Sequence, residues 1–91
     1  MFFVVAYDID NDKRRKKISD ILEGYGFRVN FSVFEIELNP AQLDSLLKKI
    51  KSVSKKTDNI RFYHICKSCA SKSFLLYKNK DIFSNSDWFV L

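Results

Sequence analysis

The stretch FFVVAYDID, residues 2–10, decides the fold. Its first part, Phe2 to Tyr7, is an unbroken apolar run with β-branched side chains, which is typical of a central strand covered on both faces. The polar residues 8–12 interrupt this pattern, and among them Asp8 and Asp10 carry carboxylates. The sequence therefore predicts a buried strand that ends in an acidic cluster.

A helix is expected directly after this cluster. Apolar residues recur there at the i, i+3, i+4 and i+7 spacing of one helix face: Ile18, Ile21, Leu22 and Tyr25. The opposite face carries a basic run over residues 13–17, and Gly26 fits the end of the helix. We expect Asp12 to cap the helix, whereas Asp8 lies too early in the chain to do so.

The remaining elements follow from apolar patterns further along the chain. Residues 28–38 change phase near Val33, so this segment is one bulged strand, a strand buried on both faces, or two short strands. Asn39 and Pro40 are typical of the start of a second helix. Strands are predicted over residues 60–66 and 74–77, and the apolar residues 88–91 end the sequence.

Divided at the phase change, the order becomes β-α-β-β-α-β, which is the ferredoxin-like α+β sandwich with an extra C-terminal strand. We expect one domain over residues 1–91, with a core over 1–78 and a tail over 79–91. In this fold the helices cover one face of the sheet, yet the strands carry apolar residues on both faces. The other face therefore indicates a homodimer, in which the tail pairs with the partner's sheet.

The charge balance indicates the kind of partner. Lys and Arg number 16 and Asp and Glu number 11, so the net charge is +5. This favours polyanions such as nucleic acid, although basicity alone equally fits a soluble protein with many surface lysines. The apolar N-terminus lacks a basic region and a cleavage site and is too short for a membrane span, so we expect a cytoplasmic protein with no membrane partner.

The acidic cluster is the best candidate for chemistry. Carboxylates at the end of a strand are held rigidly, and Mg²⁺ or Mn²⁺ can use one or two of them together with water and phosphate oxygens. The ordinary alternative is that these residues only cap the helix, which we prefer for Asp12 and leave open for Asp10. In the basic run, Arg14, Arg15 and Lys17 avoid the apolar stripe and are candidates for phosphate contacts.

Cys66 and Cys69 form a C-x-x-C pair that resembles half of a zinc site, with His64 as a possible third ligand. Structural zinc requires four ligands, and the sequence offers no second pair. We therefore do not favour a zinc or redox function, and we interpret His64 as a packed or hydrogen-bonded residue.

Together these pieces resemble a known family. The string VVAYDIDNDKRRKKISDILEGYGFRVNFSVFEIEL, residues 4–38, is similar to the start of CRISPR-associated protein two, the small nuclease-like protein of spacer acquisition. The matching features are Tyr7-Asp8-Ile9, Asp12-Lys13-Arg14-Arg15, Tyr25-Gly26, Arg28-Val29, Ser32-Val33-Phe34-Glu35 and, later, Arg61 to Cys66 with Cys69. The resemblance covers about three quarters of the chain.

The resemblance implies a ferredoxin-like homodimer whose two copies of Asp8 share one divalent metal. It implies a metal-dependent endonuclease on RNA or double-stranded DNA, or a scaffold that bridges two dimers of the CRISPR-associated integrase. Functional aromatic and basic residues of the family fall at Tyr7, Arg15, Lys17, Arg28 and Phe34. The chain departs from the family at Asn30, where many members have Gln, and at Lys17, where some have Arg. Residues 71–91 match only loosely.

Our prediction is phosphodiester hydrolysis by a dimer. Asp8 is the catalytic and metal-binding residue for Mg²⁺ or Mn²⁺. The nucleic-acid-binding residues are Arg14, Arg15, Lys17 and Arg28, and the supporting residues are Tyr7, Asp10 and Phe34. The alternatives are a non-catalytic DNA-binding scaffold for the integrase and a toxin-type endoribonuclease. A single-strand RNA-binding domain is a further alternative, but the Gly-aromatic signature expected of it is missing around Phe62.

Overall fold

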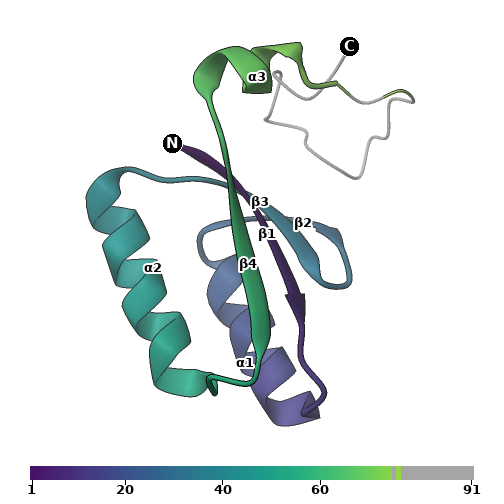
Figure 1. Ribbon diagram of the computed structural model, residues 1–91, viewed down its shortest axis with the longest axis vertical. Helices are drawn as coiled ribbons and strands as arrows, with labels where there is room; N and C mark the ends of the chain where they lie inside the picture. The colour runs from purple at the N-terminus through teal and green to yellow at the C-terminus, as the bar shows by residue number, and fades with distance from the viewer. Residues whose placement is uncertain (75, 77–91) are drawn as a thin grey trace.

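The computed structural model describes residues 1–74 and 76 (Figure 1). The elements follow one another as β1 (Phe2–Asp8), α1 (Asp12–Glu23), β2 (Gly26–Asn30), β3 (Val33–Glu37), α2 (Pro40–Val53), β4 (Asn59–Ile65) and α3 (Lys67–Lys72). The four strands form one sheet in the order β2-β3-β1-β4, and all neighbouring pairs are antiparallel. This is the predicted ferredoxin-like arrangement.

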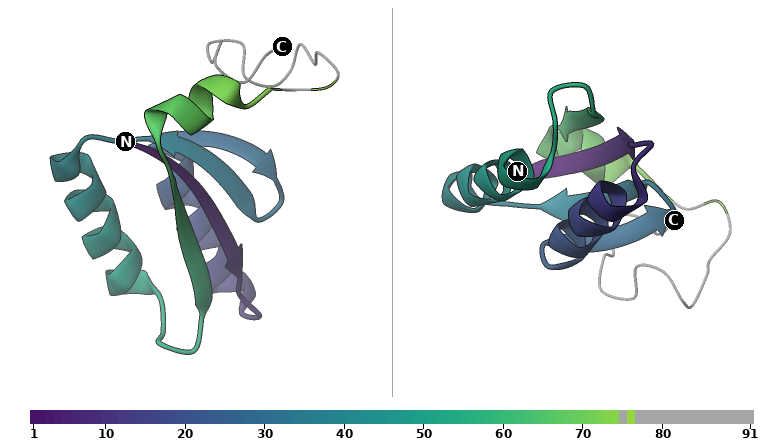
Figure 2. Two further views of the ribbon diagram at one scale, coloured as in Figure 1. Left: turned by 45° about the horizontal axis from the view of Figure 1, so that its top comes forward. Right: turned by 90° about the horizontal axis from the view of Figure 1, so that it is seen from below.

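Helices α1 and α2 lie side by side on one face of the sheet (Figure 2). Burial along β1 alternates accordingly, because Phe3, Val5 and Tyr7 face the helices and are buried. Val4 and Ala6 face the other way and are only half-buried. Within residues 1–74 and 76, β1 is thus covered on one face, not on both as its sequence predicted. We call the other side of the sheet the open face.

The segment over residues 28–38 is divided, as the phase change indicated. Strands β2 and β3 form a hairpin with Phe31 and Ser32 at the turn, and the register of β2 shifts between Arg28 and Asn30. Gly26 does not end α1. It begins β2, where an added Cβ would lie 2.4 Å from the Glu35 carbonyl oxygen, so only glycine allows the two strands to approach this closely.

The helix caps confirm one prediction and correct another. Asn39 caps α2 in a reciprocal capping box with Gln42. Helix α1 is capped by Asn11, whose side-chain oxygen accepts from the Arg14 amide at 2.9 Å. Asp12 is instead the first residue of the helix, where its negative charge still interacts favourably with the helix dipole.

The C-terminal part differs from the prediction. Residues 67–72 form the short helix α3, which the sequence did not indicate. Phe74 and Leu76 are not in a strand, and residues 75 and 77, together with the predicted tail, lie outside the described residues. Among residues 1–74 and 76, no helix is long and apolar enough to cross a membrane.

Candidate functional site

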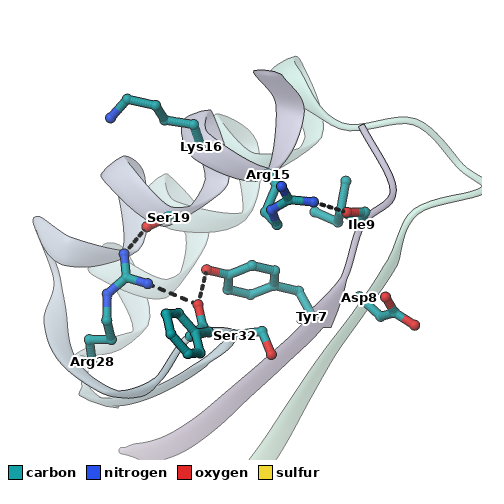
Figure 3. A pocket seen from close by; sticks show the side chains of 9 residues that line it. Tyr7, Asp8, Ile9, Arg15, Lys16, Ser19, Arg28 and Ser32 are labelled. Carbon is teal, nitrogen blue, oxygen red and sulfur yellow. Dashed lines mark hydrogen bonds between the residues drawn. The ribbon is translucent and has the colours of Figure 1, made fainter. Parts of the chain in front are cut away.

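A cavity of about 340 Å³ opens where the end of β1, helix α1 and the β2–β3 turn meet (Figure 3). Four of the predicted site residues line this cavity: Tyr7, Asp8, Arg15 and Arg28. The remaining lining residues are Ile9, Lys16, Ser19, Phe31 and Ser32. The fold thus brings the acidic strand end together with two residues of the basic run, Arg15 and Lys16.

Asp8 lies at the boundary between this cavity and the open face. It is exposed, it is the last residue of β1, and it pairs in register with Asn59 of β4. Because side chains alternate along a strand, Asp8 belongs to the same face as Val4 and Ala6. It also lines a hollow of about 210 Å³ on that face with Arg61. Figure 3 shows its carboxylate pointing away from Tyr7.

The β2–β3 turn is held by a shared acceptor. The carbonyl oxygen of Phe31 accepts from the Tyr7 hydroxyl at 3.0 Å and from the Arg28 guanidinium at 2.9 Å. The second terminal nitrogen of the Arg28 guanidinium donates to the Ser19 hydroxyl and, at 2.7 Å, to the Glu23 carboxylate. Arg28 therefore connects α1 to the turn, and most of its donors already have protein partners.

Arg15 makes structural hydrogen bonds and also lines the cavity. One guanidinium nitrogen donates to the Ile9 carbonyl at 3.0 Å, and the other pairs with Asp12. These bonds hold the loop between β1 and α1, while the side chain keeps enough exposure to reach a ligand. Lys16 also lines the cavity, and it pairs with Asp20 only at 3.3 Å on the exposed surface. Sequence reasoning did not select Lys16 within the basic run.

Arg14 points elsewhere. It makes two hydrogen bonds of 2.9 Å to Asp58, whose side chain is only 4% exposed. These bonds, together with the Lys55 amide, lower the pKa of Asp58. The pair joins α1 to the loop before β4, and Arg14 does not line the cavity. Its predicted nucleic-acid contact thus has no geometric support, and no local pattern connects two residues this far apart in sequence.

The other predicted residues also lie outside the cavity. Phe34 is fully buried beneath it, with the Arg28 guanidinium 5.1 Å from its ring centroid. Its influence on the site therefore acts through packing. Asp10 and Lys17 are exposed residues of the β1–α1 loop and of α1.

The side chains of one copy of the chain provide only part of a metal site. No group of three or more His, Cys, Asp or Glu residues gathers within residues 1–74 and 76. Mg²⁺ is commonly held by one or two carboxylates, with water and phosphate oxygens as the other ligands. A single Asp8 is a minimal site of this kind, and a second carboxylate from another copy would complete it.

The cysteine pair lies at the opposite end of β4. Cys66 caps α3, and its sulfur accepts from the Cys69 amide at 3.3 Å. A hydrogen bond from the Cys69 thiol is the main cause that lowers the pKa of Cys66 to about 7, and the same contact raises the pKa of Cys69. His64 stacks on Phe3 with ring centroids 5.0 Å apart, but the residue as a whole is exposed, so it is only partly packed.

Fold and site together define a small ferredoxin-like α+β protein with an acidic strand end beside a basic cavity. The model of the family described as CRISPR associated protein Cas2 matches residues 1–73. The chain belongs to this family.

Individual relatives agree with the family match. A Synechocystis protein named CRISPR-associated endoribonuclease Cas2 3 is 47% identical over 62 residues, covering 67% of each chain. The crystal structure of Streptococcus pyogenes Cas2 at pH 6.5 is similar with a TM-score of 0.68 and 33% identity, over 74% of this chain and 88% of that one. A chain of a partial Cas6-RT-Cas1–Cas2 complex is similar with a TM-score of 0.69 and 35% identity, and the match covers 79% of this chain and 80% of that one.

Proposed function

We propose that this protein is a metal-dependent endonuclease of CRISPR spacer acquisition, which acts in the cytoplasm as a homodimer. Its reaction is the hydrolysis of phosphodiester bonds in RNA or double-stranded DNA. The observation that carries this proposal is the position of Asp8, an exposed carboxylate at a rigid strand end beside a basic cavity. Relatives named as endoribonucleases support it.

The homodimer follows from the face on which Asp8 lies. On the open face Val4 lies beside Tyr63 and Glu35, and Phe27 lies beside Glu35. Phe27 and Tyr63 are exposed there, on the side of the sheet that neither α1 nor α2 covers (Figure 2). A second copy that covers this face would bring a second Asp8 toward the first. A symmetric interface of this kind satisfies both the apolar surface and the incomplete metal site.

The charged and aromatic residues in and around the cavity can then be given roles in this reaction. Asp8 would hold Mg²⁺ or Mn²⁺, which when bound supplies an activated water and neutralises phosphate charge. Arg15 and Lys16 provide positive charge where a phosphate backbone would enter, and Lys17 extends this charge along α1. Tyr7 and Arg28 position the β2–β3 turn that forms the far wall.

The test is cleavage by Asp8→Asn, which keeps the size of the side chain and removes its charge. We expect cleavage of RNA or DNA by the wild type to require Mg²⁺ or Mn²⁺, to stop in EDTA, and to fall by at least about a hundredfold in Asp8→Asn. Asp44→Asn is the matched control and should retain most activity, because Asp44 is an exposed carboxylate of α2 that does not line the cavity. Full cleavage by Asp8→Asn, or cleavage that is insensitive to EDTA, would refute the proposal.

A second candidate function is that of a non-catalytic DNA-binding scaffold for the CRISPR-associated integrase. It is favoured by the structural similarity to a chain of the Cas6-RT-Cas1–Cas2 complex. Co-purification with the integrase, together with spacer acquisition that survives Asp8→Asn, would select the scaffold. Cleavage by a protein that does not bind the integrase would instead select a toxin-type endoribonuclease.

A further inference from the structure

The ring of Phe31 lies outside the hydrophobic core formed by the described residues. Its side chain is 88% exposed, the highest exposure among the large hydrophobic residues of the described part of the chain. It stands at the β2–β3 turn and lines the cavity that also contains Arg15 and Lys16. A single exposed apolar residue is common on protein surfaces. The informative observation is that this ring lines the same cavity as the cationic side chains of Arg15 and Lys16.

The backbone of Phe31 is fixed on both sides. Its carbonyl accepts from Tyr7 and Arg28, and its amide donates to the Asn30 side chain at 2.8 Å. The next residue is fixed as well, because the Ser32 carbonyl accepts from the Tyr7 amide at 3.0 Å. The ring is thus presented from an anchored main chain, which reduces the entropy that a bound ligand would remove.

We propose that Phe31 is a base-stacking residue, which binds an unpaired base of a single-stranded substrate while Arg15 and Lys16 contact the adjoining phosphates. Aromatic rings and cationic side chains are the combination by which proteins hold single-stranded nucleic acid. In a duplex the bases are stacked on one another, so the ring cannot reach their faces. This inference rests on the proposed function, because it assigns a substrate feature to the same cavity.

Binding is measured separately from cleavage, in the Asp8→Asn background, with a labelled single-stranded RNA of about twelve nucleotides and its duplex. Phe31→Ala should weaken single-strand binding about tenfold, the loss typical of one stacked base. Phe31→Leu, which keeps the apolar surface but not the π-face, should lose as much. Phe31→Tyr should bind within about twofold of the parent, and duplex binding should change less than about twofold in every variant.

Phe74→Ala is the matched control, because Phe74 is exposed but does not line the cavity. It should leave single-strand binding unchanged. The inference is overturned if Phe31→Leu binds like the parent, if single strand and duplex weaken equally, or if Phe31→Ala loses only self-association or integrase binding. Unchanged thermal unfolding of the variants confirms that the fold is intact, since the ring is not packed.

The two proposals fail in different ways. If the wild type does not cleave RNA or DNA with Mg²⁺ or Mn²⁺, the nuclease proposal fails, and a loss of single-strand binding in Phe31→Ala still supports stacking. If the wild type cleaves and Phe31→Ala binds the single strand normally, the nuclease proposal stands and the stacking inference fails.

Discussion

Replacing Glu35 by glutamine should remove most of the loss of stability that we expect between about pH 5 and pH 8. The Glu35 carboxyl lies half-buried on the open face, between Val4 of β1 and Phe27 of β2. None of the ion pairs formed among residues 1–74 and 76 includes it. Burial raises its pKa from 4.5 to about 7.

The sign of the effect follows from this raised pKa. The folded protein binds the Glu35 proton more tightly than the unfolded chain does, so the protonated carboxyl contributes stability below the unfolded pKa. That contribution is lost as the pH rises through the folded value near 7. The full shift corresponds to about 3 kcal/mol. Because the group is only partly buried, solvent screening reduces the expected loss to about 1–2 kcal/mol.

The assay is urea unfolding of the wild type and Glu35→Gln at several pH values, at one protein concentration because the stability of a dimer depends on it. The two proteins should be equally stable near pH 4, below the unfolded pKa, and Glu35→Gln should be more stable by about 1–2 kcal/mol near pH 8. Glu37→Gln is the control, since Glu37 lies on the same face of β3 but is exposed. An unchanged pH dependence in Glu35→Gln would show that the Glu35 pKa is not raised.

Three further predictions concern the rest of the molecule. Arg14→Ala should lower the free energy of unfolding in the wild type and much less in the Asp58→Asn background, since it removes both hydrogen bonds from Arg14 to the Asp58 carboxylate; a double-mutant cycle without coupling would contradict this reasoning. Gly26→Ala should cost about 1–3 kcal/mol, because its Cβ would meet the Glu35 carbonyl; a thermal midpoint equal to the wild type would contradict this. Cys66 should be alkylated by iodoacetamide before Cys69, with a rate that rises through about pH 7, and mass spectrometry that finds the reverse order would refute the assigned thiolate.

The sequence predicted the elements whose patterns are local. The apolar run of β1, the helical spacing of α1 and the Asn39–Pro40 start of α2 each act within a few residues, and so does the phase change that divides β2 from β3. The prediction of Asp12 as the cap was wrong, because the side chain of Asn11 suits the position equally well and caps the helix instead. Helix α3 was missed because its six residues carry no apolar stripe.

For the candidate site, the sequence could predict only those neighbours whose positions follow from the order of the strands and helices. Asp8 and Arg15 adjoin the same short loop, so their meeting follows from the β1–α1 connection. The pairing of Arg14 with Asp58 depends instead on where the loop before β4 passes α1, which no nearby residue reveals. The same holds for Phe31, whose importance arises from the carbonyl that Tyr7 and Arg28 share.

That shared carbonyl also determines how the protein can evolve. Any residue at position 31 offers the same carbonyl oxygen to Tyr7 and Arg28, so the turn is independent of the side chain attached there. Substitution of Tyr7 or Arg28, by contrast, would remove a side-chain hydrogen bond that holds the turn. If its ring stacks on a base as proposed, position 31 is a place where one substitution can change substrate preference while the hydrogen bonds of the turn remain.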